Sequence, residues 1–243
     1  EIRRSIHKQA LINNGLFGIL ISILGYEIGM FIFKKTKIVV FNPLLIGIIF
    51  VILVLVFGHI SYNTYNSSAK FINDMLEPAT VVLAVPLYKQ IKLLKKYLWP
   101  VILGLLCGCL VSMSFVSVLC YLFGFNAKLI ASLIPKSVTT PISYAISSNL
   151  GGITSITVVC VIITGITGAI VGPTIFKLFK IKHPVAMGIA FGTASHSLGT
   201  ATAFEMGEIQ GAMSSLSIGL AGIITVILST PIYMLVLKIF KLS

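Results

Sequence analysis

The chain has 243 residues, of which 57% are hydrophobic and only 10% are charged, and its formal net charge at pH 7 is +12. A soluble globular domain carries about 25% charged residues, so this composition excludes a water-soluble protein. The basic residues stand in short clusters between apolar runs, where membrane proteins place them to hold loops in the cytoplasm, so the charge does not indicate nucleic-acid binding. We expect an all-α protein, a polytopic transmembrane helical bundle that forms one integral membrane domain over residues 1–243.

Five apolar runs are long enough to cross a hydrocarbon core of roughly 30 Å, which takes about 20 residues of helix. They cover residues 11–33, 38–57, 97–123, 152–171 and 213–237. Three other segments, 71–87, 129–150 and 185–204, are apolar but broken by Pro, Gly, Ser, Thr and acidic residues. We expect about seven crossings, with 129–150 forming a re-entrant element or hairpin, and broken segments in both halves are compatible with an inverted repeat.

Three lysine clusters, at 34–37, 89–96 and 177–182, predict the orientation. The positive-inside bias places all three in the cytoplasm, and the loop 58–69, which has no Lys or Arg, then lies outside. Lys238 and Lys241 also fall inside if 185–204 and 213–237 both cross.

Polar residues gather in the broken segments, and lipid tolerates an interrupted helix only where protein buries it or water reaches it. The first broken segment contains Glu77, Pro78 and Thr80. A carboxylate inside a membrane segment costs at least about 2.5–3.5 kcal/mol unless it is paired or wet, which suggests a functional role for Glu77. Glu77 could equally cap a helix that begins at Pro78, where a negative charge is favoured, and the two roles are compatible.

The second broken segment carries hydroxyls and an amide, including Thr139, Thr140 and Asn149. These groups could bind a carboxylate, or they could bond to backbone carbonyls and to neighbouring helices. Lys136 in the same segment could attract an anion, although a lone lysine in a loop is more often a solvated charge.

The third broken segment is the richest in polar groups, with Thr193, Ser195, His196 and Ser197. His196 is the only histidine within an apolar span, and imidazole exchanges a proton at physiological pH. It is a candidate for substrate binding or proton coupling, and the alternative is a packing histidine bonded to a facing hydroxyl.

Enzyme signatures are missing from the sequence. There is no phosphate-binding Gly-rich loop ending in Lys-Ser or Lys-Thr and no His-Glu-x-x-His pair. The four cysteines stand inside apolar runs without the spacing of a zinc site. We therefore expect no enzymatic activity, no cofactor and no metal.

The broken segments resemble those of a known family. Glu77-Pro78-Ala79-Thr80, Thr139-Thr140-Pro141 and the stretch from Gly192 through His196 to Gly199 are similar to the LrgB/CidB family of bacterial membrane proteins. The resemblance runs from about residue 11 to residue 240, and members are described as antiholin-like or murein hydrolase regulators. The plastid glycolate/glycerate translocator carries a similar domain.

The resemblance implies two functions in the bacterial plasma membrane. The first is transport of a small monocarboxylate such as glycolate, glycerate, pyruvate or lactate, which the buried polar groups favour. The second is regulation of autolysis with a small holin-like membrane protein of the LrgA/CidA type, and we also expect a homo-oligomer, most simply a dimer. Our hypothesis for transport is that a set of polar residues converges near the bilayer midplane, with His196 or Glu77 carrying a coupled proton. The set comprises Glu77, Thr80, Thr139, Thr140, Asn149, Thr193, Ser195, His196 and Ser197.

Overall fold

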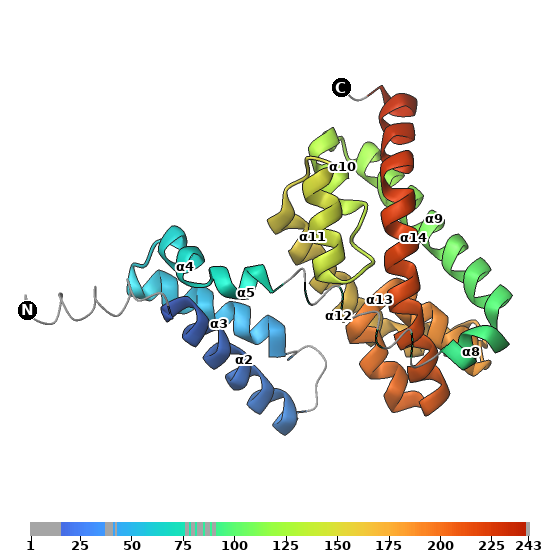
Figure 1. Ribbon diagram of the computed structural model, residues 1–243, viewed down its shortest axis with the longest axis horizontal. Coiled ribbons are helices and arrows are strands. Elements are labelled where there is room, and N and C mark those ends of the chain that lie inside the picture. The colour runs from blue at the N-terminus through green and yellow to red at the C-terminus, as the bar shows by residue number, and fades with distance from the viewer. Residues whose placement is uncertain are drawn as a thin grey trace, which may run out of the picture. The chain divides into compact units, whose positions relative to one another are not determined.

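The computed structural model describes residues 16–36, 41, 43–75, 78, 81, 85, 88 and 91–241. Its regular elements in this part of the chain are helices (Figure 1). Four helices, Phe17–Thr36, Leu98–Leu122, Thr154–Leu178 and Glu208–Phe240, are long and apolar enough to cross a membrane, and Leu45–Gly58 is a shorter apolar helix. The protein is therefore an all-α membrane bundle, and its contacts divide it into two units, residues 1–79 and 80–243.

The first unit is built on a pair of apolar helices, α2 (Phe17–Thr36) and α3 (Pro43–Gly58), followed by α4 (Tyr62–Ser68) and α5 (Lys70–Asp74). Glycines let the first pair approach closely: a Cβ on Gly25 would lie 3.0 Å from the Gly47 carbonyl oxygen. Ser68 Oγ accepts a 2.9 Å hydrogen bond from the Gly18 backbone N–H. Small residues at helix contacts and side-chain hydrogen bonds are the usual means of joining membrane helices.

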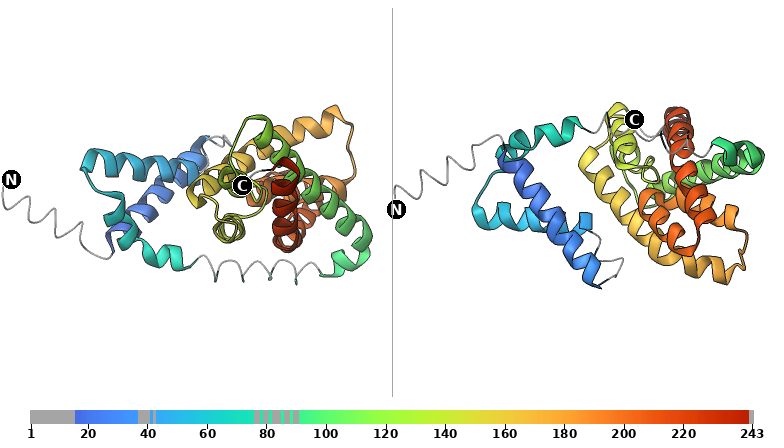
Figure 2. Two further views of the ribbon diagram at one scale, coloured as in Figure 1. Left: turned by 90° about the horizontal axis from the view of Figure 1, so that it is seen from above. Right: turned by 60° about the horizontal axis from the view of Figure 1, so that its bottom comes forward.

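The second unit contains α8 (Ile91–Lys96), α9 (Leu98–Leu122), α10 (Ala127–Leu133), α11 (Thr140–Asn149), α12 (Thr154–Leu178), α13 (Pro184–Met206) and α14 (Glu208–Phe240). α9 and α14 run in the same direction, since Cys109 lies against Ala221 near their middles and Tyr121 stacks on Phe240 at their ends, with ring centroids 4.0 Å apart. Seen from above, α14 lies between α9 and α11 (Figure 2).

The segment from α10 to α11 is a hairpin. Ser143 Oγ donates to the Pro135 carbonyl at 2.5 Å near the turn. Nearer the open end, Thr157 Oγ1 on α12 lies 2.9 Å from the Ser132 carbonyl oxygen and 2.7 Å from Ser147 Oγ, within hydrogen-bond distance of both. The chain therefore enters the bundle beside the end of α9 and returns to the start of α12, which confirms the hairpin expected for residues 129–150.

α13 also folds back on itself, at His196. Its first arm runs parallel to α14, because Gly188 lies against Gln210 and Gly192 against Ser214. Its second arm runs antiparallel to α14, because Thr200 Oγ1 lies 2.7 Å from Ser214 Oγ and Phe204 then packs against Gly211.

A direct contact between the two arms of α13 confirms this reversal. A Cβ on Gly199 would lie only 3.0 Å from the Phe191 ring, whereas residues eight apart in a straight helix are about 12 Å apart along its axis. The expected crossing of residues 185–204 is therefore wrong, and this segment is a second hairpin that enters from the opposite end of the unit.

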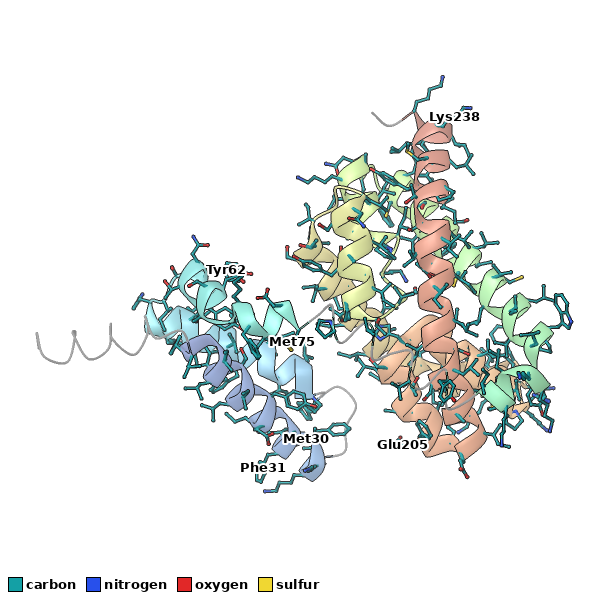
Figure 3. The ribbon with its side chains drawn as sticks, in the orientation of Figure 1. Met30, Phe31, Tyr62, Met75, Glu205 and Lys238 are labelled. Carbon is teal, nitrogen blue, oxygen red and sulfur yellow. The ribbon has the colours of Figure 1, made fainter. Side chains whose placement is uncertain are left out.

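This reversal changes the predicted orientation of the C-terminus. Glu205, at the end of α13, and Lys238, near the end of α14, lie at opposite ends of the second unit (Figure 3). α14 is the one crossing after Lys182, so Lys238 and Lys241 lie at the end away from Lys177, Lys180 and Lys182. Lys238 and Lys241 would share a side with the 177–182 lysines only if residues 185–204 crossed the membrane. Those residues form a hairpin instead.

Candidate functional site

Two hairpin turns reach the middle of the second unit from its opposite ends. The α10–α11 turn reaches α9, where Ser137 Oγ lies 2.8 Å from Ser112 Oγ. The α13 turn reaches α12 from the other end, where His196 Nε2 lies 3.1 Å from the Val161 carbonyl oxygen. Two helical segments begin at these turns, α11 and the second arm of α13, and helix N-termini carry partial positive charge.

His196 forms the α13 turn with an unusual backbone. Its φ of 40° and ψ of −128° lie outside the helical region, and a positive φ is uncommon for a residue with a side chain. The hydroxyl of Thr200 donates to the His196 carbonyl at 2.8 Å and supports the start of the second arm. A carbonyl oxygen can only accept, so the 3.1 Å contact with Val161 requires a proton on His196 Nε2.

Two glycines on α12 make room for this turn. Gly165 and Gly168 are three residues apart and so lie on one face of the helix. A Cβ on Gly165 would lie 2.7 Å from His196 Cε1, and one on Gly168 would overlap the Ser195 side chain. The turn therefore packs directly against the α12 backbone, and Ser195 and His196 are almost fully buried, 1% and 4% exposed.

A cavity of about 950 Å³ lies beside the two turns, between α9, α12 and α13. On α9 it follows a stripe along about four turns of helix, made by Tyr97, Pro100, Gly104, Gly108 and Ser112. Where α9 and α13 begin, the cavity is lined by Tyr97 and His183, and at the level of the hairpin turns it is lined by Lys136 and Ser137 of the α10–α11 turn.

The cavity wall is rich in hydroxyls at the level of the hairpin turns. Thr164 and Thr167 of α12 and Thr193 and Ser195 of α13 line it together with Ser112 and Ser137. Thr193 Oγ1 donates to the Ile189 carbonyl of its own helix at 2.6 Å, so its methyl group faces Gly108.

The predicted site residues are brought together only in part. Thr193 and Ser195 line the cavity, whereas the His196 ring points to α12 and Ser197 is exposed. Thr139 and Thr140 lie at the start of α11, at the hairpin turn. Within the described residues, Thr139 Oγ1 is buried and has no hydrogen-bond partner.

Asn149 does not join this group. It is exposed at the far end of α11, and a ten-residue helix separates it from the turn by about 13 Å. Glu77 and Thr80 lie outside the described residues, so their predicted roles stay predictions.

Lys136 lines the cavity, although the expected site did not include it. Its position between two prolines, Pro135 and Pro141, in a hydroxyl-rich break was a signal that it belonged to a turn inside the bundle. Ser112, Thr164 and Thr167 had no comparable signal, because they stand within ordinary apolar helices and only packing shows which way they face. The described residues contain no group of three His, Cys, Asp or Glu side chains that could hold a metal ion.

Comparison of the sequence with known proteins places the chain in one family, by a family model and by individual relatives alike. The model of the LrgB-like family matches residues 22–235. The antiholin-like proteins LrgB of Bacillus mycoides (strain KBAB4) and of Bacillus cereus (strain B4264) are each 37% identical to this chain over 219 residues, which is 90% of this chain and 95% of theirs. No solved structure matches.

Proposed function

Because this chain belongs to the LrgB-like family, we propose that it is an antiholin-like regulator that restrains murein hydrolase activity from the bacterial plasma membrane. The observation that carries the proposal is the extent of the similarity: relatives named antiholin-like protein LrgB match over 95% of their own length. The family match, residues 22–235, thus includes both hairpins and the residues that line the cavity.

The proposal includes partners. A small holin-like membrane protein would be the natural counterpart of an antiholin-like bundle, and we propose that this chain acts with one and forms a homo-oligomer. The many large apolar side chains on the outside of the helices, such as Phe115 and Val111 on α9, are suited to lipid and to neighbouring helices alike.

The test is an autolysis measurement in the bacterium that carries the gene. Deleting the gene is expected to speed detergent-induced lysis and to raise murein hydrolase activity on zymograms, and restoring the wild-type chain should reverse both. Unchanged lysis and unchanged zymograms after deletion, with the holin-like partner present, would argue against the regulatory role.

A second function, transport of a small monocarboxylate, is favoured by a separate observation. Two hairpins enter from opposite ends of the second unit, and each turn places the start of a helical segment near the cavity. Secondary transporters bind anionic groups with the N-termini of interrupted helices near the midplane. Thr193 and Ser195 would contribute to the wall of such a site.

Uptake into proteoliposomes separates the two functions. Pyruvate, glycolate, glycerate and lactate would be compared with and without an inward proton gradient. Saturable, gradient-dependent uptake would support a proton-coupled carrier. Well-folded protein that takes up none of them, alone or with its holin-like partner, would leave regulation as the function.

A further inference from the structure

We propose that the cavity of the second unit is an anion vestibule, open at the lysine-rich end of α9 and α13, and that Lys136 at its inner end selects the anion. The proposal deepens the transport candidate by assigning the group that recognises negative charge. The proposal concerns the charge of Lys136 and the entry of small anions into the cavity, so it can be tested without measuring transport.

The first support is the position of Lys136. Its Nζ donates to Ser137 Oγ at 3.4 Å, and Ser137 Oγ lies 2.8 Å from Ser112 Oγ on α9. This chain of contacts fixes the α10–α11 turn to α9 and directs the ammonium group to the inner end of the cavity, which both Lys136 and Ser112 line.

The second support is that the described wall of the cavity offers no counter-charge to Lys136. None of the described residues that line the cavity is acidic. The C-terminal unit has only two acidic residues in its sequence, Glu205 and Glu208, and both stand at the α13–α14 junction. An ammonium inside a membrane domain is costly without a partner, so a small anion that enters the cavity would provide the missing neutralisation.

The third support is the charge at the entrance. Two residues that line the cavity where α9 and α13 begin, Tyr97 and His183, each directly follow a lysine, Lys96 and Lys182. Lys92 and Lys95 on α8, Lys177 in the last turn of α12 and Lys180 just after it gather at the same end of these helices. A cleft lined by charge of one sign concentrates ligands of the opposite sign, and the positive-inside bias makes this the cytoplasmic end.

The ligand class follows from these features. It is a small anion with oxygen acceptors, because Lys136 shares the cavity wall with hydroxyls of Ser112, Ser137 and Thr164, and hydroxyls can donate hydrogen bonds to such atoms. A cation has no acidic group to bind in the described wall, and the lysines would repel it from the mouth.

The test measures the reactivity of a cysteine at the inner end. The four native cysteines are replaced by alanine, and Ser112→Cys, a nearly isosteric change, is introduced. Its rate of reaction is measured with an anionic sulfonatoethyl and a cationic trimethylammonioethyl methanethiosulfonate. Each rate is divided by the rate of the same reagent with a free thiol, and vesicles of both orientations are used.

The contacts of Ser137 Oγ with Lys136 and Ser112 place Lys136 Nζ within about 6 Å of Ser112 Oγ. At that distance, reversing the reagent's charge changes the rate by about tenfold even with water-like screening. We therefore expect about a tenfold preference for the anionic reagent, and faster reaction from the cytoplasmic side. Lys136→Gln should abolish the preference and Lys136→Arg should keep it.

Three results would overturn the proposal: equal normalised rates for the two reagents with Lys136 present, an anionic preference that survives Lys136→Gln, or no faster reaction from the cytoplasmic side. The first comparison uses unaltered Lys136, so the test stands even if Lys136→Gln fails to fold. None of these rates depends on autolysis or uptake, so failure here is distinct from failure of either proposed function.

Discussion

Replacing Gly192 with alanine should destabilise the protein, because the first arm of α13 packs on the α14 backbone at this glycine. A Cβ on Gly192 would lie 2.5 Å from the Ser214 carbonyl oxygen and 2.6 Å from Ser217 Cβ. A backbone carbonyl inside a helix cannot rotate away, so the two helices must separate. Overpacking of this kind costs typically about 1–3 kcal/mol, which exceeds the roughly 1 kcal/mol that alanine gains over glycine in a helix.

The matched control is Gly104→Ala on α9, where the nearest atom to a new Cβ is Ile189 Cγ2 at 3.4 Å. There the helix preference of alanine should prevail, and stability should be unchanged or higher. Thermal unfolding of the purified variants in detergent gives the comparison, and a loss of 1–3 kcal/mol corresponds to a fall in Tm of roughly 2–12 °C for a chain of this size. If Gly192→Ala unfolds at the same temperature as Gly104→Ala or above it, the close approach of the α13 first arm to α14 is refuted.

Three further stability predictions use the same assay. Thr200→Val and Ser214→Ala should each destabilise the protein. Their double-mutant cycle should give a coupling free energy of about 0.6 kcal/mol, which is typical of hydrogen bonds between membrane helices. Zero coupling would mean that the 2.7 Å contact between the two hydroxyls contributes nothing to stability. His196→Ala should lower the free energy of unfolding by about 1–3 kcal/mol, because the hydrogen bond to the Val161 carbonyl of α12 is lost. The control His183→Ala, at the start of α13 beside the cavity, should change it by less than about 0.5 kcal/mol. Equal effects would contradict the packing role of His196. Thr139→Val should leave stability unchanged or raise it by about 1 kcal/mol, because it removes a buried hydroxyl that has no partner among the described residues; a clear loss would indicate a partner there.

The sequence was sufficient to predict the long helices and the first hairpin. Runs of about 20 apolar residues have few alternatives in a membrane, and helices are present at α2, α3, α9, α12 and α14 where they were expected. The hairpin at residues 129–150 was predictable from two prolines within the segment and from the number of membrane crossings. Both can be read from the sequence without knowing how the helices pack.

The second hairpin could not be predicted in the same way. Gly, Ser and Thr mark residues 185–204 as a broken segment, but no proline follows Pro184, and nothing in the segment shows that the chain reverses there rather than crossing. The reversal at His196 depends on room that Gly165 and Gly168 provide on α12, about 30 residues earlier in the chain. Such a contact is a property of packing and leaves little trace in the segment itself.

The site was predicted in part for a related reason. Thr193 and Ser195 line the cavity as expected of polar residues in a broken helix. Asn149 was wrongly expected beside Thr139 and Thr140, because a polar composition shared along 129–150 does not show that they occupy opposite ends of α11. Lys136 was underrated because a single lysine in a break looks the same in sequence whether the break lies in water or inside a bundle.

The most direct test of the account is the sidedness of α13, since the hairpin at His196 is what brings a second turn to the cavity. Single cysteines at His183, Glu208 and Lys241 in a cysteine-free background would be labelled with a membrane-impermeant maleimide in vesicles of known orientation. We predict that His183→Cys and Glu208→Cys label from the same side and Lys241→Cys from the other. Labelling of His183→Cys and Glu208→Cys from opposite sides would mean that α13 crosses the membrane, and would contradict the account.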